Sequence, residues 1–157
     1  MRSLDGYQAW FFDLGGTLVE IERDEIALSA QDRVVPVPGA MEALARLGDQ
    51  RIFIVSNQAA VAQGSLAAMR AYDFIRQVDA LCGGAVTDFR FAMHPPEANH
   101  PWRKPAPGML QDLATVYGLE LAHCAMVGDS QNDENCARNA GIAAFFWIDD
   151  FLSRSTA

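Results

Sequence analysis

The chain has 157 residues, half of them hydrophobic and a fifth charged, and its formal net charge is −8. This length and composition predict one globular domain over residues 1–157 and exclude a disordered chain. The acidic balance disfavours general binding to nucleic acid or to anionic membranes, since both depend on an excess of Lys and Arg.

Cysteine content and apolar patterning indicate the cellular compartment of the protein. The sequence has three cysteines without a CxxC pair, which predicts free thiols in a reducing compartment. Its N-terminus has no apolar signal core, and no apolar run approaches the roughly 20 residues that a membrane-spanning helix requires. We therefore expect a cytoplasmic protein without a membrane partner.

Short apolar runs alternate along the chain with segments whose apolar residues have helical spacing. Glycines and prolines separate these segments. The alternation predicts an α/β protein with a three-layer Rossmann-like fold and a mainly parallel five-stranded sheet. In chain order the expected elements are a strand at 9–12, a loop at 20–36 with a helical turn near 25–30, a helix at 38–48, a strand at 52–55, a helix at 66–81, a strand at 85–93, a loop up to 107, a helix at 107–117, a strand at 124–127, a helix at 132–140 and a strand at 142–148.

Three of the predicted strands end in polar residues that a buried core does not require. The first is followed by Asp13, the second by Ser56 and Asn57, and the fourth by Asp129. Parallel strands bring their carboxyl ends to one edge of the sheet, where ligands bind in folds of this type. Lys104, which precedes a predicted helix, can reach the same edge.

These side chains suit phosphoryl transfer. Asp13 and Asp129 can share a Mg²⁺ ion, which prefers carboxylate and phosphate oxygens. A carboxylate can also attack phosphorus and form an acyl phosphate, provided that Mg²⁺ and the Lys104 ammonium offset the repulsion between the two anions. Ser56 and Asn57 can donate hydrogen bonds to phosphate oxygens, and the glycines after Asp13 let backbone amides approach the transferring group.

Four segments, in order along the chain, resemble the four motifs of the haloacid dehalogenase (HAD)-like hydrolase superfamily. The first resembles a hydrophobic run followed by DxDGT, and the last resembles GDxxxD. Little sequence separates the motifs, which leaves no room for a large cap domain. The Ser-Asn-Gln and Arg-Lys-Pro strings look like the capless branch of heptose-bisphosphate and histidinol-phosphate phosphatases. The four segments are Phe11–Leu18, Ile54–Gln58, Arg103–Leu110 and Met126–Asp133.

The resemblance implies a role for each residue at a matched position. It implies a Mg²⁺-dependent phosphohydrolase that acts on a small phosphorylated metabolite through an aspartyl-phosphate intermediate. Asp13 would be the nucleophile, with Ser56 and Lys104 as further catalytic residues. The substrate-binding residues would be Ser56, Asn57, Arg103, Lys104 and Gly16, and the metal would be held by Asp13, the Gly15 backbone carbonyl, Asp129 and Asp133.

The chain departs from the family pattern at Gly15, where the family has a second aspartate that serves as general acid and base. Such a residue contributes about 10²–10⁴-fold to the rate. The substrate could have a good leaving group, as acyl and aryl phosphates do, or Glu20 or a histidine from residues 94–100 could replace the aspartate. Alternatively, the chain is a non-catalytic phospho-ligand-binding or regulatory domain. The sequence leaves these interpretations open, and it also leaves open whether the chain forms a homo-oligomer.

Overall fold

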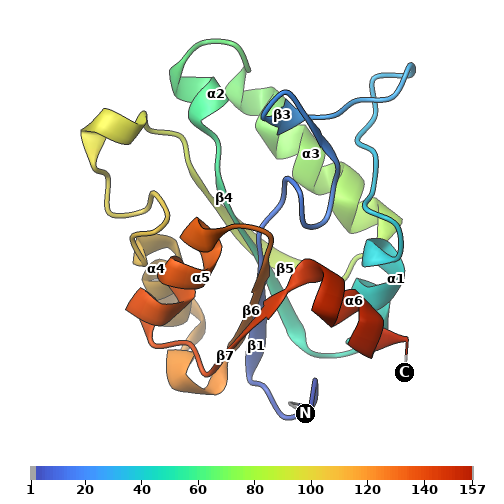
Figure 1. The fold of residues 1–157 in the computed structure, drawn as a ribbon, viewed down its shortest axis with the longest axis vertical. Helices are drawn as coiled ribbons and strands as arrows, with labels where there is room; N and C mark the ends of the chain where they lie inside the picture. Colours follow the sequence, from blue (N-terminus) through green and yellow to red (C-terminus); the bar gives the residue numbers. More distant parts are fainter. Residues whose placement is uncertain (1–2, 157) are drawn as a thin grey trace.

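A parallel five-stranded sheet runs through the centre of the computed structural model, which describes residues 3–156 (Figure 1). The spatial order of the strands is β5-β4-β1-β6-β7, and every neighbouring pair is parallel. The predicted α/β architecture with a five-stranded parallel sheet is therefore confirmed. The strands are β1 (Ala9–Phe12), β4 (Arg51–Asn57), β5 (Val86–Ala92), β6 (Ala125–Gly128) and β7 (Ala144–Trp147).

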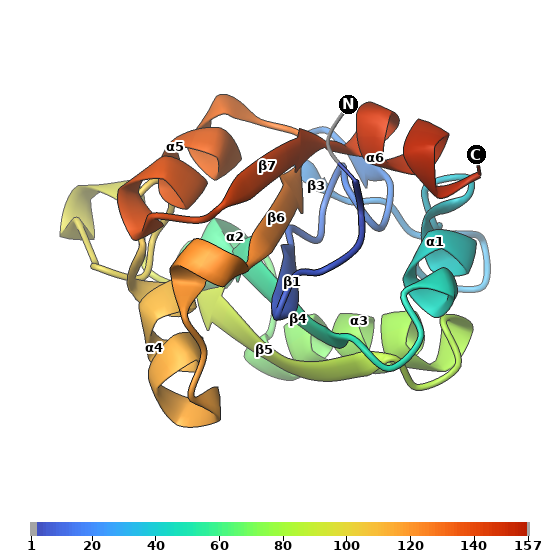
Figure 2. The ribbon, with the colours of Figure 1, turned by 90° about the horizontal axis from the view of Figure 1, so that it is seen from below.

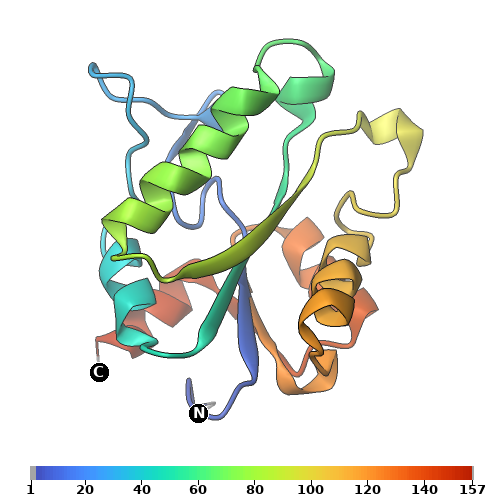
Figure 3. The same cartoon turned by 180° about the vertical axis from the view of Figure 1, so that it is seen from behind.

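Helices cover both faces of the sheet, which gives the three layers that are visible in Figure 2. One face is covered by α1 (Ala40–Arg46), α3 (Ala68–Leu81) and α6 (Ile148–Ser155). The opposite face is covered by α4 (Gly108–Tyr117) and α5 (Gln131–Ala140). The view from behind shows the same division (Figure 3). The remaining helical elements of residues 3–156 are the short α2 (Ala59–Ala62) and two 3₁₀ turns, η1 (Pro96–Ala98) and η2 (Leu121–His123).

Alternate side chains of β1 supply both halves of the core. Trp10 and Phe12 pack into the cluster beneath α1, α3 and α6, whereas Ala9 and Phe11 pack into the cluster beneath α4 and α5. All four residues are fully buried. A strand buried on both faces needs a continuous apolar sequence, which is why this run was recognisable as a central strand. Burial of each large side chain contributes about 1.5–3 kcal/mol.

A β-hairpin follows β1 in place of the expected loop with a helical turn. It consists of β2 (Ile21–Glu22) and β3 (Glu25–Ile26), which pair antiparallel. The prediction of a helical turn near residues 25–30 is wrong, because the backbone bonds across the hairpin, as the Ala27 N–H does to the Glu20 carbonyl at 2.9 Å. The two turn residues between the strands, 23 and 24, have φ values of 53° and 64°. Left-handed backbone at both positions matches a type I′ turn.

The C-terminal end of the chain also differs from its prediction. The last strand covers residues 144–147 rather than 142–148, and α6, which was not predicted, begins at Ile148. Ile148 and Phe151 are buried in the core, so α6 completes the helical layer on its face. Asp149 and Asp150 occupy its first turn, where carboxylates stabilise a helix N-terminus. The short α2 was not predicted either.

The segments between the motif positions hold core elements. Between Asp13 and Ser56 the described chain forms the hairpin and α1, and between Ser56 and Lys104 it forms α2, α3, β5 and η1. Neither segment of residues 3–156 contains a cap domain. All three cysteines are free, as predicted, and all three are buried. Within the described residues, no helix combines the length and the apolar character needed to cross a membrane.

Candidate active site

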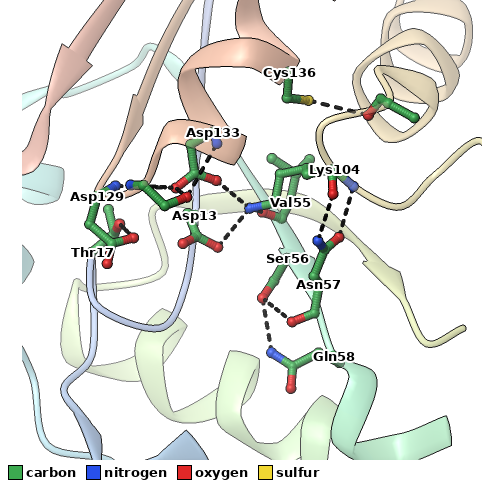
Figure 4. A network of polar contacts seen from close by, with 12 residues as sticks. Asp13, Thr17, Val55, Ser56, Asn57, Gln58, Lys104, Asp129, Asp133 and Cys136 are labelled. Atoms are coloured by element: carbon green, nitrogen blue, oxygen red, sulfur yellow. Dashed lines mark hydrogen bonds and ion pairs between the residues drawn. The ribbon is translucent and has the colours of Figure 1, made fainter. Parts of the chain in front are cut away.

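The polar residues predicted at the strand ends meet at one edge of the sheet. The neighbouring strands β4, β1 and β6 are parallel, so their carboxyl ends lie side by side. Ser56 and Asn57 are the last two residues of β4, Asp13 follows β1, and Asp129 follows β6. Figure 4 shows these side chains together with Lys104, which reaches the same edge from the loop before α4. The structure therefore brings together the constellation that the sequence suggested.

Lys104 is the buried cation at the centre of this group. Its Nζ donates to Asp13 Oδ1 at 2.8 Å, to Asp133 Oδ1 at 2.6 Å and to the Val55 carbonyl at 3.0 Å. Burial alone would lower the pKa of the Lys104 ammonium, but the two carboxylates hold that pKa above its usual range. The side chain therefore stays charged, and it fixes the position of Asp13.

Asp13 is buried among like charges. Burial raises the pKa of its carboxyl to about 7 against the lowering effect of Lys104, and the nearby carboxylates of Asp133 and Asp129 raise it further. One carboxylate oxygen from each of these three aspartates lies within 4.8 Å of the others. With a single ammonium beside three carboxylates, the ionised group carries excess negative charge. A hard divalent cation with oxygen ligands, such as Mg²⁺, fits both the charge and the donor set.

Asp133 has two structural tasks. Its Oδ1 accepts from Lys104, and its Oδ2 accepts from the Asp129 N–H at 3.2 Å and from the Ser130 N–H and hydroxyl at 3.2 and 2.9 Å. The Ser130 hydroxyl accepts from the Asp133 N–H in return, which completes a capping box at the start of α5. Burial alone would raise the pKa of Asp133, but Lys104 and Ser130 hold it below its usual range. Asp133 therefore stays ionised with both oxygens engaged.

Two residues of the loop after β1 determine where the Asp129 side chain lies. The Thr17 hydroxyl donates to Asp129 Oδ1 at 3.2 Å. Gly16 has a φ of +78°, and a Cβ at this position would overlap Asp129 Oδ2. The Gly16 amide, predicted to approach the substrate, instead donates to the Val19 carbonyl at 2.8 Å. Gly16 thus makes room for Asp129, and Thr17, which the sequence analysis did not single out, positions it.

Asn57 positions Lys104. Its Oδ1 accepts from the Lys104 backbone N–H at 2.9 Å, and its Nδ2 donates to the Lys104 backbone carbonyl at 3.1 Å. The amide that was predicted to donate to phosphate is therefore engaged by the chain that carries the lysine. A contact of this kind depends on how residues 47 positions apart meet in the fold, so it was not predictable from the sequence.

Gln58 orients Ser56. Its Nε2 donates to Ser56 Oγ at 2.9 Å, and both side chains are buried. Because Oγ accepts this bond, the Ser56 hydroxyl hydrogen is left to donate elsewhere; its other contact, with the Asn57 carbonyl, is long at 3.5 Å. No functional role was predicted for Gln58 from the sequence. Its place two residues after Ser56 was the one available signal.

A cavity of about 580 Å³ opens above Asp13. In the described part of the chain, Arg103 Nη1 is buried without a hydrogen-bond partner, and Arg103 lines this cavity. Glu20 and the histidines of the 94–100 loop, the suggested replacements for an acid, are not among the described residues that line it. His94 and His100 stack on each other instead, with ring centroids 3.6 Å apart. The predicted site residues that line the cavity are Asp13, Gly15, Ser56, Asn57, Arg103, Lys104 and Asp133.

The space beside Gly15 is filled by the hairpin. A Cβ at residue 15 would lie 2.9 Å from Ile21 Cγ2 and 3.1 Å from Ile26 Cδ1. Both isoleucines also line the cavity. A side chain at residue 15 would therefore require the Ile21 and Ile26 side chains to shift.

Comparisons with known proteins find relatives of this chain in one family of hydrolases. A family model for HAD-hydrolase-like proteins matches residues 101–147. The chain is 32% identical over 138 residues to the D-glycero-beta-D-manno-heptose-1,7-bisphosphate 7-phosphatase of Bordetella bronchiseptica, a match that covers 80% of this chain and 77% of the relative. It is 32% identical over 126 residues to the protein of the same name from Pseudomonas aeruginosa, with 77% and 70% covered.

A solved structure has the same fold. The crystal structure of D,D-heptose 1,7-bisphosphate phosphatase from B. bronchiseptica, complexed with magnesium and phosphate, superposes with a TM-score of 0.82. The superposition covers 94% of this chain and 96% of that one, at 23% sequence identity. At this identity the likeness establishes the arrangement of the elements.

Proposed function

Because the chain belongs to the haloacid-dehalogenase-like hydrolase superfamily and is a phosphatase within it, we propose that it hydrolyses a small phosphorylated metabolite with Mg²⁺ bound and with Asp13 as nucleophile. The observation that carries the proposal is the buried group in which Lys104 bridges Asp13 and Asp133, with Asp129 close by. The relatives named above are heptose-bisphosphate phosphatases, so sugar phosphates belong among the compounds to be tested. The free thiols support a location in a reducing compartment, and we propose the cytoplasm.

The metal would be held by residues from two strand ends. Asp13, Asp129 and the Gly15 backbone carbonyl are the proposed ligands, and Asp133, whose oxygens are already engaged, would orient metal-bound water. Mg²⁺ would supply positive charge against the phosphate oxygens. Gly16 supports this site indirectly, since it leaves the space that Asp129 occupies.

The chemical step depends on Asp13. Its carboxylate attacks phosphorus, the bond from phosphorus to the leaving oxygen breaks, and an aspartyl phosphate forms. The Lys104 ammonium, 2.8 Å from Asp13 Oδ1, offsets the charge that the phosphoryl group brings to the carboxylate. Water then hydrolyses the aspartyl phosphate and restores the Asp13 carboxylate with release of inorganic phosphate.

Three side chains would bind the phosphoryl oxygens. Lys104 does so with its charge, Ser56 with the hydroxyl hydrogen that Gln58 leaves free, and Arg103 with its buried, unpartnered Nη1. Asn57 contributes by holding the Lys104 backbone. Since the side chains that we propose as nucleophile, ammonium partner and metal ligands lie close together, they favour a phosphatase over a non-catalytic binding domain.

Phosphate release from a panel of phosphomonoesters and acyl phosphates tests the proposal. Each compound is assayed with Mg²⁺ and with EDTA, using wild type, Asp13→Asn and Asp49→Asn, the last an exposed aspartate outside the site. We expect turnover that EDTA abolishes, that Asp13→Asn lowers by several orders of magnitude, and that Asp49→Asn preserves. Undiminished turnover in Asp13→Asn, or in EDTA, would refute the proposal.

A further inference from the structure

The cavity above Asp13 has an apolar wall that phosphate binding does not require. Ile21 lies in β2 of the hairpin and Leu28 in the segment after β3; both line the cavity, and they are 46% and 38% exposed. Exposed side chains of this size cost free energy unless they contact another apolar group. The apolar residues that line the cavity are Ile21, Ile26, Leu28, Leu66 and Phe74.

The leaving group departs on the side of the cavity that faces away from Asp13, because attack on phosphorus is in line. An alkoxide leaving group would need a proton there. Lys104 lies on the opposite side, bonded to the attacking carboxylate at 2.8 Å. Residue 15 has no side chain, and the methyl groups of Ile21 and Ile26 occupy the adjacent space. An apolar surface cannot protonate a leaving oxygen, and it disfavours a localised charge.

Two carboxylates on the hairpin also line the cavity, Asp24 and Glu25. Both residues are exposed. Glu25 Oε1 accepts from the Ser65 hydroxyl at 3.4 Å, which links the hairpin to the segment before α3. This contact holds the Glu25 carboxylate beside that segment.

Building on the proposed function, we propose that the preferred substrate has an apolar leaving group that departs without a proton: an aryl phosphate, or an acyl phosphate with an apolar acyl group. The bond from Asp13 to phosphorus forms as the bond from phosphorus to the leaving oxygen breaks. The leaving oxygen keeps the electron pair and departs as a phenolate or carboxylate. Water then attacks the aspartyl phosphate, which yields the Asp13 carboxylate, inorganic phosphate and one proton.

This substrate class has a kinetic signature. The first step depends on the leaving group, whereas hydrolysis of the aspartyl phosphate is common to all substrates. Without a general acid and base, hydrolysis of the aspartyl phosphate limits kcat for substrates whose leaving group departs readily. We therefore expect a burst of phenol release close to one equivalent of enzyme, a kcat that is constant across good leaving groups, and a kcat/KM that rises with leaving-group acidity.

A leaving-group series tests the proposal. The compounds are substituted phenyl phosphates of increasing phenol acidity, benzoyl phosphate, glycerol phosphate and a sugar phosphate, all with Mg²⁺. We expect kcat/KM for the aryl and acyl phosphates to exceed that for the alkyl phosphates by about 10²-fold or more. Equal or higher kcat/KM for the alkyl phosphates would overturn this inference while the proposed function stands. Mg²⁺-dependent turnover of none of the compounds would overturn both.

Two variants test the apolar wall. Ile21→Ser should lower the ratio of kcat/KM for 1-naphthyl phosphate to kcat/KM for acetyl phosphate about tenfold. The substitution removes an apolar contact with the naphthyl ring, and the small acetyl group does not depend on that contact. The matched control, Val116→Ser, changes a residue that is 59% exposed on α4 and should leave the ratio as in wild type. An unchanged ratio in Ile21→Ser would contradict the assignment of the wall.

A third variant tests whether Glu25 acts as a general acid toward the leaving group. Glu25→Gln should keep the leaving-group dependence of the wild type. If it instead lowered turnover of alkyl phosphates while sparing aryl phosphates, Glu25 would be the proton donor, and the inferred substrate class would be wrong.

Discussion

Replacement of Lys104 by methionine tests the buried ion pairs that Lys104 forms with Asp13 and Asp133. The Lys104 side chain is 3% exposed and makes two ion pairs, with Asp13 and Asp133. Methionine has a similar volume, so the variant leaves little cavity but leaves two buried carboxylates without their cation. Removal of one partner from a buried ion pair costs about 3–5 kcal/mol. We expect Lys104→Met to lower the free energy of unfolding by about that amount when EDTA is present.

Urea denaturation at neutral pH, with EDTA and with Mg²⁺, measures this loss. Mg²⁺ should recover part of it, since a divalent cation supplies charge to the same carboxylates. The double variant Lys104→Met/Asp13→Asn should also be more stable than Lys104→Met, with a coupling of about 0.5–3 kcal/mol, because it removes one of the two unpaired charges. A loss below about 1 kcal/mol, within the range of an exposed pair, would refute the buried network.

Three other perturbations have defined outcomes. Gly16→Ala should weaken Mg²⁺ binding at least tenfold in a calorimetric titration, because its Cβ would displace the Asp129 carboxylate. Gly15→Asp combined with Ile21→Ala should raise kcat/KM for glycerol phosphate above that of Gly15→Asp alone, since the isoleucine fills the space that the new side chain needs. Burial would raise the pKa of Asp88, but hydrogen bonds with the Tyr117 hydroxyl and with Arg90 hold that pKa below its usual range. The ionised Asp88 carboxylate therefore contributes its full stabilisation at pH values above the ordinary aspartate pKa. This contribution is lost as the pH falls through the lowered pKa. Asp88→Asn should therefore flatten the fall of Tm below about pH 4.

The central strands and the strand-end residues were predictable because both follow from burial and chain direction. A strand buried on both faces must be apolar throughout, as β1 is, and parallel strands must deliver their next residues to one edge. Asp13, Ser56 and Asp129 could be placed together on these grounds alone. The hairpin was not predictable in the same way, because Arg23 and Asp24 form its turn with left-handed backbone and without the glycine that usually marks such a turn.

The tasks of individual side chains depended on contacts that only the fold creates. Asn57 was assigned to phosphate because its amide lies at a strand end, but both amide atoms bond to the backbone of Lys104. The amide of Gly16 likewise bonds to Val19. In the C-terminal region, the apolar run continued through Ile148, so the end of β7 and the start of α6 could not be separated by periodicity.

Detection of phosphate on Asp13 is the most direct test of Asp13 as the nucleophile. Wild-type protein with Mg²⁺ is mixed with an aryl phosphate, quenched in acid within the burst phase, and digested for mass spectrometry. We expect a phosphorylated peptide that contains Asp13 and that appears as the phenol is released, and no such peptide in Asp13→Asn. Burst turnover with an unmodified Asp13 peptide, or phosphate on another residue, would contradict this assignment.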